Sequence, residues 1–230
     1  QSGTNKVFDS NVGWHNNNGY DWYISHMWKR HAGFDVQTYT GLSVNGSRSH
    51  SMGIAPEMMW VKRRDTTSNW AVYHKDLHQY PQDYYLVLND SAAVVNASQW
   101  WKPPTNTHWF TAIGGLNNVN GASYIAMLFA SVAGISKVGY YTGNGSSQTI
   151  TTGFSPRFVI IRRTDGSQDN WVILDTLRGW AAGNDNYISL NLTNAQSSGD
   201  MGAPTSTGFT LTSDGWVNHN TGKFIYYAHA

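Results

Sequence analysis

The chain has 230 residues and a formal net charge of +1, and 40% of its residues are hydrophobic while only 13% are charged. This length suits one large all-β domain or two domains of about 100 residues each. The small net charge excludes capture of nucleic acid or an anionic membrane by a strong electrostatic field. No apolar run approaches the ~20 residues of a membrane span, so we expect neither nucleic-acid binding nor membrane insertion. Because the chain has no cysteine, disulfides and thiolate chemistry are excluded as well.

Residue usage favours strands joined by tight turns over helices. Glutamate, a good helix former, occurs only at Glu57, and the other members of the 14 acidic residues are aspartates. Aspartate and the 23 glycines prefer turns, whereas the 11 tryptophans and 13 tyrosines are typical of strands. The sequence therefore predicts an all-β fold.

At the start of the chain, residues 1–33 are predicted to be the C-terminal strands of a preceding repeat, or strands that complete the first domain. An Asn- and Gly-rich turn at 13–19 leads into an aromatic strand, and the same order recurs at 215–222 near the end of the chain. Because the chain begins with Gln1 and not with methionine, we expect a fragment or a processed chain.

Further along, one pattern occurs twice, at 53–65 and at 153–165: a Gly-x-x-Pro turn, four apolar residues, a basic pair and an aspartate. Glycine allows positive φ and proline presets φ near about −65°, so each turn can start a strand. Four consecutive apolar residues indicate a strand buried on both faces or in a sandwich core. The internal repeat predicts two similar domains, residues 34–134 and 135–230.

Other segments match between the two copies and keep the same order. Short polar linkers between matched strands predict β-hairpins, and turn signals recur roughly every 8–12 residues, as in sandwich folds. We therefore predict tandem antiparallel β-sandwich repeats of a jelly-roll-like kind. The matched pairs are 34–41 with 135–143, 69–73 with 170–174, 85–89 with 187–191, and Phe110-Thr111 with Phe209-Thr210-Leu211.

The order of these motifs resembles that of a repeated domain of unknown function found in tail-fibre and other virion proteins of phages, especially marine ones. The order is Tyr-Thr-Gly, Gly-x-x-Pro, an apolar strand, Lys/Arg-Arg-x-Asp, Asn-Trp, Tyr-Leu-x-Leu-Asn and a closing Val-Asn…Tyr-Ile strand, and it covers about residues 34–230. The resemblance implies a virion protein of the tail fibre or another external appendage, with a role in host attachment or in structure. No catalytic residues come with it.

The copies differ most in a tryptophan-rich loop of the first copy, where the second copy has the polar segment 196–200. Because a core needs similar residues in both copies, we expect this loop to lie outside the framework. An indole face can stack on a sugar ring, and exposed aromatic patches mark interaction sites. The alternative is that these tryptophans pack between the repeats or against a neighbouring subunit. The candidate ligand-binding residues are Trp100, Trp101, Lys102, Asn106, His108 and Trp109.

We do not expect an enzyme, a metal site or a cofactor. His74 and His78 have a metal-ligand spacing only on a helix, and their segment is predicted to be a loop. A glycosidase needs two carboxylates held across a sugar bond. Asp76, Asp83 and Asp90 lie in one region, but aspartates in loops are ordinary turn residues. No Gly-x-Ser-x-Gly elbow occurs. The basic pairs of the repeat could bind phosphates or acidic sugars, but we expect their charges to pair with Asp65 and Asp165.

Three functions follow from these observations. The first is a non-enzymatic phage virion module that contacts a host cell-surface glycan or protein receptor alongside other virion proteins. We expect it to be a homo-oligomer, with a trimer as the predicted form, because multiplied weak sites gain avidity. The second is a purely structural virion part, such as a capsid decoration or a fibre shaft, in which the tryptophan-rich loop is an assembly contact. The third is a polysaccharide depolymerase.

Overall fold

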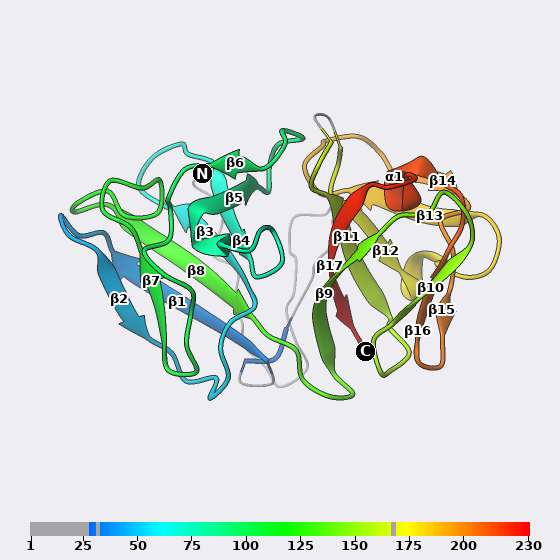
Figure 1. The fold of residues 1–230 in the computed structure, drawn as a ribbon, viewed down its shortest axis with the longest axis horizontal. Coiled ribbons are helices and arrows are strands. Elements are labelled where there is room, and N and C mark those ends of the chain that lie inside the picture. Colours follow the sequence, from blue (N-terminus) through cyan, green and yellow to red (C-terminus); the bar gives the residue numbers. More distant parts are fainter. Residues whose placement is uncertain (1–27, 31–32, 167–168) are drawn as a thin grey trace, which may run out of the picture.

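The computed structural model describes residues 28–30, 33–166 and 169–230, and most of the predicted segment 1–33 therefore lies outside the described residues. It confirms an all-β fold of antiparallel sandwiches (Figure 1). The first sandwich consists of β1 (Phe34–Thr40), β2 (Gly46–Ser49), β3 (Met58–Arg63), β4 (Trp70–His74), the short 3-10 helix η1 (Pro81–Asp83), β5 (Tyr84–Val87), β6 (Val95–Asn96), β7 (His108–Thr111) and β8 (Ser123–Phe129).

The second sandwich repeats this order of elements, with β15 and α1 in addition. Its members are β9 (Ser136–Thr142), β10 (Gln148–Thr151), β11 (Phe158–Arg163), β12 (Val172–Asp175), η2 (Thr176–Arg178), β13 (Asp185–Ser189), β14 (Ser197–Gly199), β15 (Pro204–Thr205), β16 (Gly208–Leu211), α1 (Gly215–Asn218) and β17 (Lys223–His229). No helix among the described residues is both long and apolar enough to cross a membrane.

Each sandwich packs a large sheet against a small one. Within the described residues, the large sheets run β1-β8-β3-β4-β5-β6 and β9-β17-β11-β12-β13-β14, so equivalent strands occupy equivalent places. The small sheets are β2-β7 in the first sandwich and β10-β16-β15 in the second. Both predicted hairpins form, since β3 pairs with β4 and β11 with β12 in antiparallel register.

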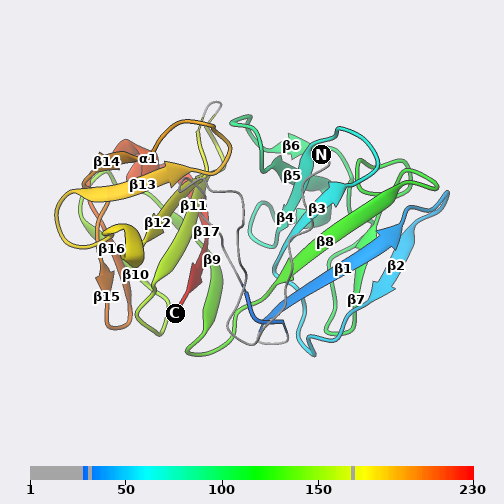
Figure 2. The same cartoon turned by 180° about the vertical axis from the view of Figure 1, so that it is seen from behind.

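The two large sheets face each other across a central core, with the small sheets on the outside (Figures 1 and 2). Along β3, Met58 and Trp60 belong to the central core, whereas Met59 and Val61 belong to the core of the first sandwich. Successive side chains of a strand point to opposite faces, so a strand between two cores needs apolar residues at every position. The predicted strand buried on both faces is therefore confirmed.

Motifs that recur in both copies hold the framework together. The Tyr39 hydroxyl donates to the Asn117 carbonyl at 2.7 Å, and the Tyr141 hydroxyl donates to the Val217 carbonyl at 2.5 Å. A Cβ at Gly41, which follows the first of these tyrosines by two residues, would lie only 2.0 Å from a backbone carbonyl oxygen. Glycine at this position thus allows the strand end to approach the loop before the last strand.

The basic pairs also serve the framework. Arg63 Nε lies 2.6 Å from an Asp65 carboxylate oxygen, and Arg163 pairs with Asp165 at 2.8 Å. The buried Arg162 reaches the first sandwich, where its Nη2 donates to the carbonyls of residues 91 and 92 at 2.9 and 2.6 Å. Burial lowers the pKa of Arg162 to about 10. The predicted pairing with Asp65 and Asp165 is confirmed for Arg63 and Arg163, whereas Arg162 instead helps to join the two sandwiches.

Candidate ligand-binding surface

Two of the six candidate residues are core residues. Trp100 and Trp109 are both 0% exposed and lie in the core of the first sandwich, not between the two sandwiches. Trp109 Nε1 donates to Gln37 Oε1 at 2.8 Å. The Trp100 ring stands edge-on to Tyr73, with centroids 5.6 Å apart. The expectation that the whole tryptophan-rich loop lies outside the framework is therefore wrong, and neither indole offers a face to a ligand.

The register of the small sheets explains the error at Trp109. Trp109 pairs with Arg48 on β2, and Phe209 pairs with Ile150 at the corresponding place on β10. Phe209 is thus the counterpart of Trp109, and the sequence match of Phe110 with Phe209 is wrong by one residue. A shift of one residue moves a side chain to the other face of the strand, which made Trp109 look unmatched.

Trp100 shows a different reason for the same error. The core of the second sandwich contains Trp180, which precedes β13, whereas Trp100 follows β6. A core must be filled to a high density, but this volume can come from different points in the chain. A large residue that is absent from one copy can therefore still belong to the framework of the other.

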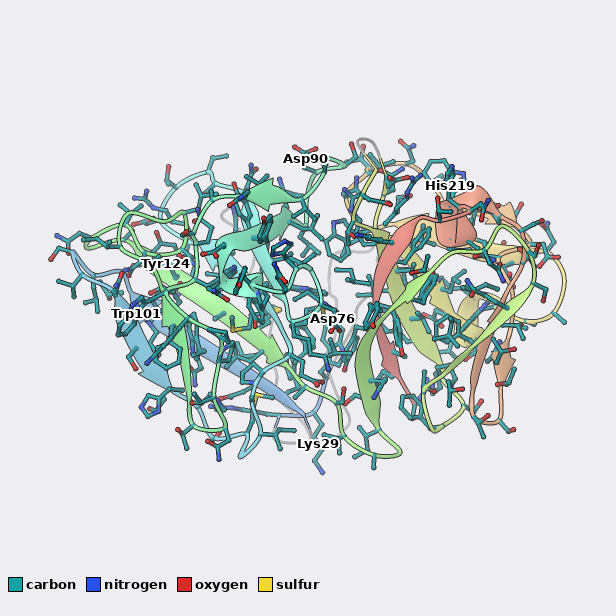
Figure 3. All side chains as sticks on the ribbon, in the orientation of Figure 1. Lys29, Asp76, Asp90, Trp101, Tyr124 and His219 are labelled. Carbon is teal, nitrogen blue, oxygen red and sulfur yellow. The ribbon has the colours of Figure 1, made fainter. Side chains whose placement is uncertain are left out.

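The exposed part of the candidate set centres on Trp101, which is 47% exposed. Figure 3 shows Trp101 on the side of the first sandwich that faces away from the second. Lys102 Nζ lies 4.6 Å from the Trp101 ring centroid and 4.3 Å from that of Phe110. The two rings stand edge-on at 5.8 Å. The lysine ammonium is thus held by two aromatic rings through cation–π attraction.

Phe110 is a site residue that the sequence did not reveal. Cross-strand pairs share a face, so Ser47 lies on the same outer face as Phe110, and Ser49 on the same face as His108. The His108 ring stacks on Phe110 with centroids 6.4 Å apart. Strand alternation places His108 and Phe110 together, and this is the signal that could have indicated Phe110. Asn106 is exposed in the preceding loop.

A groove that the sequence did not indicate lies beside this surface, between β1 and β2. Within the described residues these two strands are not paired with each other, and the groove has a volume of about 570 Å³. Its polar lining residues are Arg30, Gln37, Thr38, Ser47, Arg48 and Ser49. The surface around Trp101 and this groove together offer an aromatic face, hydroxyl groups and guanidinium groups, which is chemistry for binding a polar ligand.

His74 and His78, the two histidines with a metal-ligand spacing, have other surroundings in the structure. In the described part of the chain, no group of three or more His, Cys, Asp or Glu side chains is placed to hold a metal ion. His74 is fully buried, its Nδ1 accepts the Asp76 N–H at 3.1 Å, and burial lowers its pKa to about 3. The His78 ring instead packs against Tyr84, with centroids 4.2 Å apart.

Comparison with known proteins links the chain to one family. A family model described as a domain of unknown function (DUF7483) matches residues 11–230. The match runs through both sandwiches and includes most of the segment before β1. No curated protein sequence matches the chain.

Proposed function

We propose a function for this chain, which belongs to the family described as a domain of unknown function (DUF7483). The proposal rests on the residues of the chain itself. The protein is a non-enzymatic module of a phage virion, carried on a tail fibre or another external appendage. Its first sandwich contacts a glycan of the host cell surface. The assignment to a virion rests on the order of sequence motifs, and the assignment of the contact rests on Trp101.

The observation that carries the binding role is the exposure of Trp101 beside Lys102. The half-exposed Trp101 indole lies against Lys102 and Phe110, and an exposed aromatic patch of this kind can mark an interaction site. The shared motifs have framework roles, whereas this loop differs between the copies. The rigid small sheet β2-β7 holds Phe110 beneath the loop, so the contact surface is preorganised.

The ligand chemistry follows from the groups around Trp101. An aromatic ring can stack on the apolar face of a sugar, and the exposed Ser47 and Ser49 hydroxyls can exchange hydrogen bonds with sugar hydroxyls. A single contact of this size binds weakly. We therefore propose a homo-oligomer, with a trimer as the proposed form, in which repeated sites gain avidity. Other virion proteins are the remaining proposed partners.

A second candidate function is an assembly contact within the virion, because an exposed indole can equally be covered by a neighbouring subunit. In that case the protein is a capsid decoration or part of a fibre shaft. The two functions differ in what Trp101→Ala removes. Loss of the oligomer with glycan binding intact indicates an assembly contact, and the reverse indicates a receptor site.

The test combines a glycan array and whole-cell binding with light scattering for the oligomeric state. Wild type, Trp101→Ala and the matched control Trp216→Ala are compared, because Trp216 is 43% exposed in the second sandwich. We expect Trp101→Ala to weaken binding about tenfold, equivalent to about 1.4 kcal/mol, while Trp216→Ala binds normally. Equal losses in both variants would contradict the site. Shortened chains after incubation with host capsule would indicate a depolymerase instead.

A further inference from the structure

The groove between β1 and β2 is organised around Arg48. Its guanidinium lies 3.9 Å from the Tyr39 ring centroid and 5.4 Å from that of Trp109. Nη1 donates to Thr111 Oγ1 at 2.7 Å, and Nη2 donates to the Thr40 carbonyl and to Asn118 Oδ1 at 3.3 Å each. Arg48 is thus held in one place by neutral acceptors and aromatic rings.

Arg48 has no anionic partner among the described residues. The ion pairs found there use other cations, and none includes Arg48. The side chain is half-buried, and this burial lowers its pKa. A charge removed from water without a counter-charge costs free energy. Arg162 also lacks an ion pair among the described residues, but it is fully buried, whereas Arg48 lines an open groove that a ligand can enter.

The second sandwich shows that the framework does not need the charge. There Gln148 Nε2 donates to the Thr142 carbonyl at 3.4 Å and to Asn218 Oδ1 at 2.7 Å, which correspond to the two contacts that Arg48 Nη2 makes in the first. By register, Gln148 corresponds to Gly46, and the place of Arg48 is taken by Ile150.

In the first sandwich a glycine, Gly46, stands at the place of Gln148 and leaves room for the arginine. A Cβ at Gly46 would lie 2.1 Å from Arg48 Nη1. Glycine at this place therefore admits the guanidinium, and the neutral pair Gln148 and Ile150 of the second sandwich is replaced by Gly46 and Arg48. The substitution keeps the hydrogen bonds and adds a positive charge at the groove.

The rest of the groove suits a charged sugar. Arg30 lies at its edge, more than half exposed, and binds Asp35 at 2.6 Å. The side chains of Thr38, Ser47 and Ser49 are exposed along the groove. Ser47 and Ser49 lie on the outer face of β2 with Phe110 and His108, whereas Arg48 lies on the opposite face with Trp109. Ser47, Arg48 and Ser49 all line the groove, which therefore opens along the edge of β2 next to the Trp101 surface.

We propose that Arg48 is an oxyanion-binding residue and that the glycan contacted by this protein is acidic. This inference rests on the proposed glycan-binding function and names its ligand class. The guanidinium fork matches both a carboxylate and a phosphate, so the anionic group is the carboxylate of a uronic acid or the phosphate of a phosphorylated sugar. The acidic unit enters the groove while a neighbouring sugar stacks on Trp101.

The experiment uses an array of immobilised uronic-acid glycans and phosphorylated glycans, each beside its carboxyl-reduced or dephosphorylated counterpart. Wild type is compared with the double variant Gly46→Gln/Arg48→Ile, which installs the residues of the second sandwich. Arg48→Gln is a second variant that removes the charge without new bulk, and thermal unfolding checks that each variant is folded. Trp101→Ala is tested on the same array.

We expect wild type to bind one acidic class at least about tenfold more tightly than its neutral counterpart. Both Arg48 variants should lose that preference, and the preference should weaken with salt. The two arms of the array distinguish carboxylate from phosphate. Equal binding of acidic and neutral glycans, or a preference that survives Arg48→Gln, would overturn the inference.

The outcomes also separate this inference from the proposed function. Binding of neutral glycans that depends on Trp101 supports the proposed function and overturns the oxyanion site. An acidic preference that is lost in the Arg48 variants but unaffected by Trp101→Ala supports the oxyanion site and contradicts the Trp101 contact. No glycan binding by wild type overturns both.

Discussion

The loops held by Asn118 in the first sandwich and Asn218 in the second have the same geometry but different chemistry. Asn118 Oδ1 accepts the Leu42 N–H at 2.9 Å, and Asn218 Oδ1 accepts the Asn144 N–H at 2.9 Å. The additional donor to this oxygen is Arg48 in one case and Gln148 in the other. The Arg48 guanidinium thus makes the contact that a neutral amide makes in the second sandwich, and this difference supports the proposed oxyanion site.

A difference between the copies is not sufficient evidence of function, however. Trp100 and Trp180 come from different points of the two copies, and both are buried in the core of their own sandwich. Trp101 differs from both because it is exposed. Exposure to solvent at a surface or groove therefore separates Trp101 and Arg48 from residues that only fill a core in a different way.

The largest expected effect concerns the central core. Trp171 is buried there, and its Nε1 donates to the Val87 carbonyl of the first sandwich at 3.0 Å. We expect Trp171→Ala to cost about 3–5 kcal/mol of unfolding free energy, because it leaves a cavity and an unpaired carbonyl. Trp70, the matched residue of the first sandwich, is only partly buried, so Trp70→Ala should cost less.

Urea unfolding followed by fluorescence and circular dichroism measures both variants. Because the two sandwiches share this core, we expect one transition for the whole protein. Equal losses of unfolding free energy for Trp171→Ala and Trp70→Ala would contradict the larger contribution expected from the more deeply buried Trp171.

A pair of neighbouring substitutions tests the distinction between core and surface in the tryptophan-rich loop. Trp100→Ala should cost about 3 kcal/mol or more, because a buried indole is removed. Trp101→Ala should change stability by less than about 0.5 kcal/mol, since its indole is exposed. Thermal unfolding of the two variants gives the answer, and similar losses would mean that Trp101 also supports the framework.

The pH dependence of stability tests His74, whose counterpart in the second sandwich is Asp175. Its pKa is lowered from about 6.5 in the unfolded chain to about 3 by burial. The folded protein therefore holds neutral His74 while the unfolded chain binds a proton. The contribution of neutral His74 to the free energy of unfolding is complete above about pH 6.5. Below that pH it falls by up to about 1.4 kcal/mol per pH unit.

Between pH 6.5 and 5 this loss amounts to about 2 kcal/mol. Measuring unfolding free energy across that window should show a steeper dependence for wild type than for His74→Gln. Asp76, which lies between the sandwiches in Figure 3, has a pKa raised by burial and acts in the opposite direction. It remains in the variant, so the difference between the two curves reports His74. Parallel curves would contradict a depressed pKa.

A smaller effect than that of the buried tryptophans is expected for two equivalent asparagines. Asn89 Oδ1 accepts the Trp70 N–H and Asn191 Oδ1 accepts the Trp171 N–H, both at 2.9 Å. Asn191 is less exposed than Asn89. Replacing Asn191 therefore leaves the Trp171 N–H unpaired at a place with less access to water than the Trp70 N–H. We expect Asn191→Ala to cost about 1–2 kcal/mol and Asn89→Ala about half of that. Chemical denaturation measures the two values, and the reverse order would contradict the role of burial.

Much of the fold could be predicted because its signals are local. The alternating pattern, the turn residues and the order of motifs predicted an all-β fold with paired hairpins, and four consecutive apolar residues indicated a strand buried on both faces. The site could be predicted only in part. Trp101 and Lys102 are exposed where expected, whereas Trp100 and Trp109 are core residues and Phe110 was missed.

The register of β7 could not be read from the residues, because Trp109 and Phe110 are both aromatic and either could face the core. The pairing of β2 with β7 resolves this. Arg48 was missed for a related reason, since its role depends on Gly46, on the Tyr39 ring and on a loop about 70 residues away.

The amino-acid pattern alone thus established the fold class and the repeated order of strands, because strand propensity, turn chemistry and period-2 burial act over a few neighbouring residues. Tertiary packing decided which tryptophans are buried, how the two large sheets face each other, and that Arg48 lies in a groove without an anionic partner among the described residues. These properties depend on which distant segments meet, and a side chain's burial and charge balance are set by those neighbours.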